Sequence, residues 1–381
     1  MDFSWSDEQL AFKRAVIEFA RRSLSEGALD RDRAGEFPRD LWEKCARFGI
    51  HGLPMPEEYG GASADILTTM LTMEGLGYGC PDNGLIFALN AQMWSVQMPI
   101  VYFGTPEQRA KYLPGLINGT IIGAHAMSEP DSGSDAFGLR TRAVPREGGY
   151  LLNGSKTFVT NAPMADVTLV FATVDPAKAM WGVTAFLIDR GTPGYSTGNP
   201  IEKMGMRTSP MSEVVLQDCY VTESSRLGPE GAGARIFDGS MEWERSCILA
   251  SHIGAMTRQL EEAVQYARDR QQFGQPIGRF QSVANRLVDM KVRLETARLM
   301  LYQVAWLKKV GKPATLEAAV AKLYLSECFV QSSLDAIRIR GGYGYMTEFE
   351  VERDLRDAIG GTIYSGTSDI QRNIVARLLG L

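Results

Sequence analysis

The chain has 381 residues, of which 45% are hydrophobic and 22% charged, a balance typical of globular proteins with a large core. The formal net charge is −5 and the basic residues form no cluster, which argues against a nucleic acid as the main partner. No unbroken apolar run reaches the roughly 18 residues of a membrane-spanning helix, so we expect no membrane association either.

Cysteine and histidine usage points to a reducing compartment and away from a metal centre. The five cysteines are scattered, odd in number and never spaced as a CxxC pair, so we predict buried thiols rather than disulfides. The three histidines are isolated from one another, and we predict no metal site. The acidic, polar start of the sequence lacks the basic and apolar regions of a secretory signal. These features together predict a cytoplasmic protein.

Residues 1–120 are predicted to form a helical domain. Ser6 and Gln9 have the spacing of a capping box, and apolar residues follow them at helical intervals. Residues 67–98 are apolar but interrupted by glycines and a proline, which favours buried helices. The Thr105-Pro106 pair begins another predicted helix, with proline in its first turn.

Residues 121–228 change to short β-rich runs and are predicted to form a compact β domain. The Asn153-Gly154 pair suits a type I′ turn, which predicts a hairpin between residues 150–152 and 156–160. Further predicted strands cover residues 167–174, 183–188 and 213–221.

Residues 229–381 return to helical spacing. Apolar residues recur at intervals of three and four along residues 287–305 and again along residues 316–337. A Gly-Lys-Pro turn at 311–313 separates the two runs. Long amphipathic helices with short connections favour an antiparallel bundle.

The most informative stretch lies near the C-terminus, around the loop at residues 364–368. Ser368 and Gln371 have capping-box spacing, which predicts that the last helix begins there. A helix N-terminus behind a loop of small residues can bind anionic groups through free backbone N–H groups. The alternative is a capped terminal helix without any chemistry.

Several segments together resemble the acyl-CoA dehydrogenase family of flavin enzymes. The matching segments are 127–135, 158–161, 268–278, 340–345, 356–358 and 363–372. Their order along the chain implies that family's architecture, mostly α with a central β domain. The implied parts are an N-terminal helical domain (1–120), a middle β-barrel (121–228) and a C-terminal four-helix bundle (229–381). The resemblance also implies FAD as cofactor and a homotetramer.

The resemblance implies which residues contact FAD and substrate. Met127 and Ser128 are expected at the edge of the isoalloxazine ring, and Phe158 is expected to stack on that ring, as an aromatic platform can. Arg270, Gln272 and Phe273 are expected to contact the FAD of a neighbouring subunit. Arginine suits a pyrophosphate because its planar fork binds two oxygens at once. The remaining expected FAD contacts are Thr160, Gln281, Arg338, Gly341, Gly342, Thr367 and Asp369; the expected substrate contacts are Ser134, Arg245, Tyr364, Ser365 and Gly366.

Some of these positions have simpler interpretations that the sequence leaves open. Phe158 could be an ordinary core aromatic of a strand. The segment around Arg270 could be a helix end with charges favoured by the helix dipole. The Arg338 cation could pair with the FAD phosphates or face solvent. Arg377 is implied to contact CoA, a role that applies only where CoA carries the substrate.

The catalytic base is the position at which this sequence departs from many family members. They carry glutamate at the position of Ser365, and serine cannot act as a carboxylate base. Some members that lack this glutamate carry the base on an earlier helix, immediately before an arginine, and Glu244-Arg245 matches that arrangement. Glu242 is the alternative carboxylate, but residues two apart on a helix do not share a face. We therefore predict Glu244 as the base, with the Ser365 backbone N–H bonding the thioester carbonyl.

These features predict an FAD-dependent α,β-dehydrogenation of an acyl thioester. Together with residues 83–87 and 98–101, the Ser365 and Glu244 pattern is similar to a branch that oxidises a prolyl thioester on a carrier protein to a pyrroline or pyrrole, in secondary metabolism. The alternatives are a short or branched-chain acyl-CoA dehydrogenase, or a non-catalytic flavin- or thioester-binding protein. The electron acceptor is expected to be an electron-transfer flavoprotein or oxygen.

Overall fold

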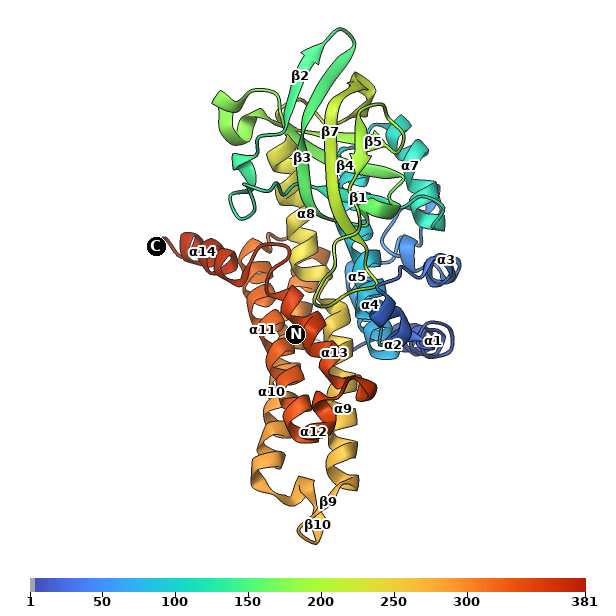
Figure 1. Cartoon of the computed structure of the whole chain (residues 1–381), viewed down its shortest axis with the longest axis vertical. Coiled ribbons are helices and arrows are strands. Elements are labelled where there is room, and N and C mark those ends of the chain that lie inside the picture. Colours follow the sequence, from blue (N-terminus) through green and yellow to red (C-terminus); the bar gives the residue numbers. More distant parts are fainter. Residues whose placement is uncertain (1–3) are drawn as a thin grey trace.

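The computed structural model describes residues 4–381, which form an elongated molecule of three successive parts. Figure 1 shows the sheet at one end of the long axis, the longest helices at the other end, and the N-terminal helices along one side between them. The predicted succession of helical domain, β domain and helical bundle is confirmed.

The N-terminal part is helical, as predicted. Its elements are α1 (Asp7–Ser23), α2 (Ala28–Ala34), α3 (Arg39–Phe48), α4 (Ile66–Gly79), α5 (Asn83–Gln92), a π-helical turn (Met93–Gln97), α6 (Met98–Phe103) and α7 (Pro106–Asn118). Ser6 and Gln9 form the predicted capping box at the start of α1. A second capping box, between Thr105 and Gln108, begins α7. The apolar region at 67–98 forms buried helices whose core is continuous with that of the bundle.

The middle part is one sheet of eight strands. The strands are β1 (Gly123–Ala126), β2 (Arg142–Arg146), β3 (Gly149–Thr160), β4 (Val167–Thr173), β5 (Val183–Asp189), β6 (Tyr195–Thr197), β7 (Met211–Thr222) and β8 (Arg226–Leu227). Their order is β6-β7-β3-β2-β4-β5-β8, with β1 paired to β4. The pairs of β1 and β2 with β4 are parallel and the other pairs are antiparallel. Along the described chain, β6 and β8 do not pair with each other, so backbone hydrogen bonds do not close the sheet into a barrel.

The predicted hairpin turn at Asn153-Gly154 is wrong. Both residues lie inside β3, which continues to Thr160. The pairing of β3 with β7 shifts between Leu152 and Gly154, so the pair forms a bulge in a strand and not a turn between strands. The Asn153 side chain bonds Asp218 on β7, with its Oδ1 accepting from the Asp218 N–H at 2.8 Å. A cross-strand partner of this kind replaces the local contacts that favour a turn.

The C-terminal part is the predicted helical bundle. Its helices are α8 (Gly233–Cys247), α9 (Ala250–Asp269), α10 (Gln281–Lys309), α11 (Thr315–Arg340), α12 (Gly342–Tyr345), α13 (Val351–Gly361) and α14 (Ser368–Leu378). The two-residue strands β9 (Gln271–Gln272) and β10 (Gln275–Pro276) form a hairpin between α9 and α10, at the tip of the molecule farthest from the sheet (Figure 1). Helix α14 projects sideways from the bundle.

The predicted capping box of the last helix is also wrong in detail. Thr367 is the N-cap, and its hydroxyl accepts from the Ile370 N–H at 3.2 Å. Ser368 is the first helical residue, and its hydroxyl donates to Glu327 at 2.7 Å. The Gln371 amide donates to the carbonyl oxygens of Ser365 at 3.1 Å and Gly366 at 3.0 Å. Thr367 thus caps α14, Gln371 holds the loop against α14, and Ser368 ties the loop to α11, so the three residues do not form one reciprocal cap.

Two further predictions concern the state of the cysteines and the absence of a membrane-spanning helix. All five cysteines are buried free thiols, as predicted. Between residues 4 and 381, no helix has both the length and the apolar character that a bilayer crossing requires.

Candidate active site

Glu244, on α8, lies between two serine hydroxyls from distant parts of the chain. The Ser365 hydroxyl donates to one carboxylate oxygen, Oε1, at 2.6 Å. The Ser95 hydroxyl donates to the other, Oε2, at 2.5 Å. Ser365 belongs to the loop between α13 and α14, and Ser95 to the π-helical turn after α5. The structure thus brings the predicted base together with the serine that stands where many family members have glutamate.

The surroundings of Glu244 act on its proton affinity in opposite directions. Burial raises the pKa of this carboxyl above its ordinary value, because the anion loses water. The two serine hydroxyls, the neighbouring Arg245 and the Lys322 ammonium on α11 favour the anion and lower the pKa. The net direction is upward, which suits a carboxylate that must accept a proton from a weakly acidic C–H group.

The alternative carboxylate, Glu242, faces elsewhere. Its Oε1 accepts from Lys308 at 2.6 Å, and its Oε2 from the Thr315 hydroxyl at 3.3 Å. These partners lie at the end of α10 and the start of α11, and neither bonds Glu244 among the described residues. The predicted separation of the two carboxylates onto different helix faces is confirmed.

The loop that carries Ser365 has an uncommon backbone. Ser365 has φ +54°, in the left-handed region that non-glycine residues seldom occupy. Within residues 4–381 the backbone N–H of Ser365 donates to no acceptor, since the backbone bonds of the loop are made by its neighbours. A backbone N–H without a partner in this loop, whose Ser365 hydroxyl bonds Glu244, could donate to a carbonyl oxygen of a bound ligand, and the predicted bond to a thioester carbonyl stays a prediction.

Tyr364 packs the same loop against the interior. Its ring lies 4.7 Å from Phe87 between centroids, and its hydroxyl lies 3.3 Å from Nε2 of His252. The Lys322 ammonium lies 6.0 Å from the centre of the Tyr364 ring. Arg245, the residue after Glu244, is half-buried, and among the described residues its Nε has no hydrogen-bond partner.

A second group of predicted residues lies on the sheet. Phe158 is 64% exposed and has φ +55°, at a register shift between β3 and β7 that turns its ring outward. It is therefore not a core aromatic, which removes the simpler interpretation. Thr160 ends the same strand and is half-buried. The segment that follows β1, which contains Met127 and Ser128, is held by hydrogen bonds to β3. The Met127 carbonyl accepts from the buried Lys156 ammonium at 3.0 Å, and the Ser128 carbonyl accepts from the Thr157 N–H at 2.9 Å. Ser134, farther along that segment, is exposed.

A third group lies far from the sheet, on the tip of the bundle. Gln272 and Phe273 belong to the β9–β10 hairpin, and the Phe273 ring is 93% exposed. The Arg270 guanidinium lies 5.5 Å from the centre of the Tyr343 ring, so the hairpin adjoins the Gly341-Gly342 turn. No atom lies within 4 Å of the place that a β-carbon would take on either glycine. These exposed groups form one surface that a ligand or another chain can approach.

Of the remaining predicted cofactor residues, Gln281, Arg338 and Asp369 are exposed and Thr367 is half-buried. Gln281 is the first residue of α10, and Arg338 lies near the end of α11, where it pairs with Asp335 at 3.5 Å. Thr367 caps α14, and Asp369 in its first turn pairs with Arg372 at 2.9 Å. The hairpin and the sheet lie at opposite ends of one chain (Figure 1), so a single chain does not bring the two groups of predicted flavin contacts together.

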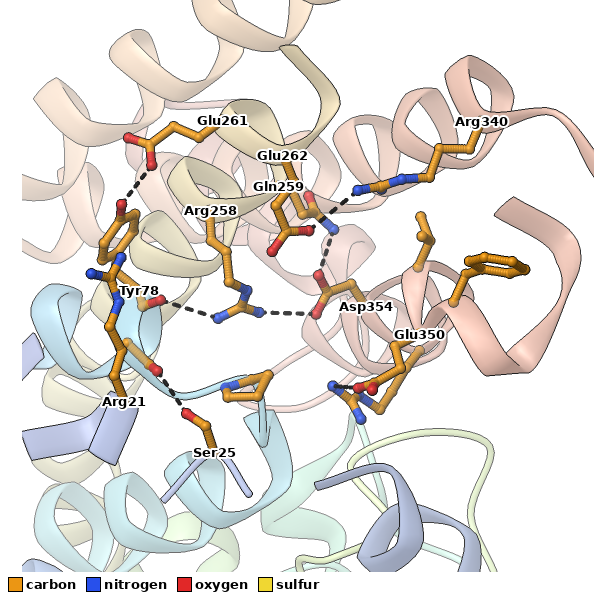
Figure 2. Close-up of a pocket in the computed structure, with 15 residues that line it drawn as sticks. Arg21, Ser25, Tyr78, Arg258, Gln259, Glu261, Glu262, Arg340, Glu350 and Asp354 are labelled. Carbon is orange, nitrogen blue, oxygen red and sulfur yellow. Dashed lines mark hydrogen bonds and ion pairs between the residues drawn. The ribbon is translucent and has the colours of Figure 1, made fainter. Parts of the chain in front are cut away.

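A cavity of about 480 Å³ lies away from Glu244, between α1, α4, α9 and α13. Figure 2 shows that its wall consists largely of charged side chains that pair with one another, such as Arg258 with Asp354 and Arg340 with Glu262. None of the predicted catalytic, flavin or substrate residues lines it.

Sequence reasoning did not identify Ser95 or Lys322. The π-helical turn that presents Ser95 leaves no signature in the sequence, because it depends on packing against α8. Lys322 left a signal that was overlooked, since it interrupts an apolar face between Ala319 and Leu325. A lysine on such a face is worth attention because a buried ammonium is costly.

Comparison with protein-family models places the chain in a known class. The acyl-CoA dehydrogenase models match in succession: the N-terminal domain at residues 6–120, the middle domain at 124–219 and the C-terminal domain at 231–380. The chain belongs to the acyl-CoA dehydrogenase family, which confirms the predicted resemblance.

Individual relatives narrow the class further. An L-prolyl-[peptidyl-carrier protein] dehydrogenase of Serratia sp. is 44% identical, with 100% of this chain and 99% of that protein covered. An enzyme of the same name from Pseudomonas fluorescens is 42% identical over the whole of both chains. The crystal structure of the prolyl acyl carrier protein oxidase AnaB superposes with a TM-score of 0.98 at 52% identity, covering 99% of this chain and 100% of that one. PigA with FAD and proline superposes with a TM-score of 0.98 at 43% identity over the whole of both chains.

Proposed function

We propose that the chain is an FAD-dependent dehydrogenase of a prolyl thioester carried on a peptidyl carrier protein. The observation that carries this proposal is the position of Glu244, whose carboxylate is held by Ser365 and Ser95 beside a free backbone N–H. The prolyl-carrier names of the Serratia and Pseudomonas relatives and of AnaB support the substrate.

In the proposed reaction, Glu244 removes the proton from the α-carbon of the acyl group. The Ser365 N–H bonds the thioester carbonyl and stabilises the charge that develops on its oxygen. FAD, when bound, supplies the acceptor for the hydride that leaves the β-carbon. Loss of the α-proton and the β-hydride produces a double bond between the α- and β-carbons. Oxidation of a prolyl ring in this way gives a pyrroline, and a second oxidation gives a pyrrole.

The residues of the chain fit a flavin of this kind. The exposed Phe158 ring offers a platform for an aromatic ring system, and the carbonyls of Met127 and Ser128 are fixed beside it by hydrogen bonds to β3. On the bundle, Arg270 offers a planar cation for a pyrophosphate, next to the open backbone of Gly341. We propose that FAD binds between these two surfaces, with Arg270, Gln272 and Phe273 supplied by a neighbouring subunit.

An oligomer follows from this arrangement. The two surfaces lie at opposite ends of a chain (Figure 1), so a complete flavin site requires a second copy. We propose the homotetramer that the family resemblance implies. The proposed location remains the cytoplasm, supported by five cysteines that are all unpaired thiols.

Electrons must leave the reduced flavin, and we propose an electron-transfer flavoprotein or oxygen as the acceptor. The word oxidase in the name of AnaB supports oxygen. Butyryl-CoA dehydrogenase of Megasphaera elsdenii, which superposes with a TM-score of 0.96 at 37% identity, supports acyl-CoA as the alternative substrate.

Mass spectrometry of a prolyl-loaded carrier protein tests the proposed substrate. Incubation with the purified holoenzyme is expected to remove one or two pairs of hydrogen atoms from the prolyl group. Isovaleryl-CoA and butyryl-CoA, incubated in parallel, serve as the comparison. An unchanged prolyl carrier with a dehydrogenated acyl-CoA would assign the chain to the acyl-CoA enzymes. No change in any thioester, from a protein that retains FAD, would favour a non-catalytic binding protein.

A further inference from the structure

We infer that Ser95 and Ser365 are positioning residues that together hold the Glu244 carboxylate in its ionised, reactive orientation. The inference rests on the proposed role of Glu244 as the base. It gives the serine at position 365 a task for its hydroxyl, which is separate from the task of its backbone N–H.

The two hydroxyls divide the carboxylate between them. Ser365 Oγ donates to Oε1 at 2.6 Å, and Ser95 Oγ donates to Oε2 at 2.5 Å. Because each oxygen has its own donor from a different element, rotation of the carboxylate about its last bond would break both bonds. Hydrogen bonds to a carboxylate also favour the anion over the acid. The pair therefore fixes the direction of the Glu244 carboxylate and favours its ionised form against the opposing effect of burial.

Each serine is presented by an unusual piece of backbone. Ser95 lies within the π-helical turn at Met93–Gln97, and such turns are rare and often occur at functional sites. Ser365 has φ +54°, which a serine seldom adopts. Two independent departures from regular backbone thus meet at the two oxygens of one side chain.

A pair of tryptophans aligns the π-helical turn with α8. Trp94 and Trp243 stack with their ring centres 6.0 Å apart and an angle of 8° between their planes. Trp94 immediately precedes Ser95, and Trp243 immediately precedes Glu244. Lys308, held by Glu242, lies 4.0 Å from the centre of the Trp243 ring and restrains it further. The stack sets the register in which the next residues of the two segments meet.

Other charged or titratable groups also face Glu244, and the test must separate their effect. They are Arg245 on α8, Lys322 on α11 and Tyr364 on the loop after α13. None of them donates a hydrogen bond to the Glu244 carboxylate among the residues that the structure describes. Their influence is therefore a background that stays constant when either serine is changed.

The variants remove one hydroxyl at a time. Ser365→Gly deletes the hydroxyl, keeps the backbone N–H and suits the positive φ angle, which Ser365→Ala would strain. Ser95→Ala deletes the other hydroxyl, and Ser95→Thr retains one. Ser246→Ala is the matched control, because this buried hydroxyl on α8 donates to the Glu242 carbonyl at 3.0 Å and does not touch Glu244.

Two readouts on the FAD-loaded protein test the inference. The first is the acidic limb of the pH profile of kcat/KM, which reports the base in the free enzyme. The second needs no substrate: the infrared band of the protonated Glu244 carboxyl, identified by its loss in Glu244→Gln and followed against pH. A hydrogen bond to a charged group corresponds to a shift of about one pH unit.

We expect both midpoints to move up by about one unit in Ser95→Ala and in Ser365→Gly, and by more in the double variant. Ser95→Thr should return the midpoint toward the wild type, and Ser246→Ala should leave it in place. Unmoved midpoints in both single variants would overturn the inference. If the infrared midpoint moves but no prolyl thioester is oxidised, the serine pair stands and the proposed substrate fails.

Discussion

At the scale of single residues, the candidate site contains charged groups whose loss of water is not fully offset by hydrogen bonds. Glu244 has two hydroxyl donors, but Lys322 is completely buried and among the described residues its ammonium has no hydrogen-bond partner. Burial lowers the pKa of Lys322 from 10.5 to about 8. Its charge nevertheless favours the Glu244 anion. We interpret Lys322 as a residue that contributes to the site at the expense of stability.

Replacing Lys322 by methionine should stabilise the protein. The lowered pKa corresponds to a penalty of roughly 3 kcal/mol for the folded state near pH 7, and methionine fills a similar volume without charge. The unfolded chain keeps the lysine proton up to about pH 10.5, whereas the folded chain loses it near pH 8. The wild type should therefore gain stability relative to Lys322→Met as the pH rises from 8 to 10.5.

Urea unfolding of both proteins between pH 7 and pH 10 measures this difference in the free energy of unfolding. Lys309→Met serves as the control, because that lysine is partly exposed and its change should have little effect. Equal stability of the wild type and Lys322→Met at pH 7 would contradict the cost that we assign to the buried ammonium. A difference in the free energy of unfolding that does not narrow as the pH rises would contradict it as well.

At the scale of elements, β3 shows how tertiary contacts overrule a local signal. Gly154 has φ +148°, and a β-carbon there would lie 2.5 Å from Thr141 Oγ1 and 2.7 Å from Thr141 Cα. The glycine is needed for the close approach of β3 to Thr141, the residue before β2, and not for a turn. A second register shift, near the end of the same strand, turns Phe158 outward. The irregular pairing of β3 therefore exposes the ring that we propose as part of the flavin surface.

Gly154→Ala should therefore destabilise the sheet more than an ordinary glycine replacement does. A residue with a β-carbon at positive φ costs about 1–2 kcal/mol, and the clash with Thr141 adds about 1–3 kcal/mol. Gly191→Ala is the comparison, since Gly191 has φ +87° and no atom within 4 Å of the added carbon. Equal losses of thermal stability in the two variants would show that the close approach to Thr141 carries no cost.

These elements also show how far the sequence could predict the structure. The helices and most strands could be predicted from the spacing of apolar residues, because the buried face of an element repeats with the period of that element. The proposal of Glu244 as the base came from the resemblance of the Glu244-Arg245 pair to family members that lack a glutamate at position 365, and not from apolar spacing. The Ser95 hydroxyl and the bulge at Gly154 were missed because each depends on a partner far away in the chain. The Thr367 cap is a local contact with Ile370, but Ser368, the predicted cap, donates instead to the distant Glu327. A pattern within one segment does not contain that partner.

At the scale of the whole molecule, the proposed flavin site is divided between two ends of the chain. Phe158 lies on β3 of the sheet and Phe273 in the β9–β10 hairpin, and both rings are largely exposed. The sheet and the hairpin lie at opposite ends of the molecule (Figure 1). Exposed aromatic side chains on opposite ends of one molecule are explained together if each completes a site in a neighbouring copy.

Mixing two inactive variants tests this division. One chain carries Phe158→Ala and the other carries Arg270→Ala with Phe273→Ala, and the two are coexpressed with different tags. In a mixed pair with shared sites, one site has both lesions and the other has none, so FAD occupancy should recover toward half of the wild type. If each chain held its own complete site, every site in the mixed pair would keep one lesion and occupancy would not recover.

The role of Glu244 as the base is tested most directly by anaerobic bleaching of the flavin by a prolyl-loaded carrier protein, followed by stopped-flow absorbance. We expect that Glu244→Gln retains FAD but bleaches about 10²–10⁴ times more slowly than the wild type. Glu242→Gln should stay close to the wild-type rate, because Glu242 faces Lys308 and Thr315. Adding Ser365→Glu to Glu244→Gln should restore part of the rate, since a carboxylate at position 365 reaches the same place. Bleaching at the wild-type rate in Glu244→Gln, with FAD fully bound, would contradict the role of Glu244 as the base.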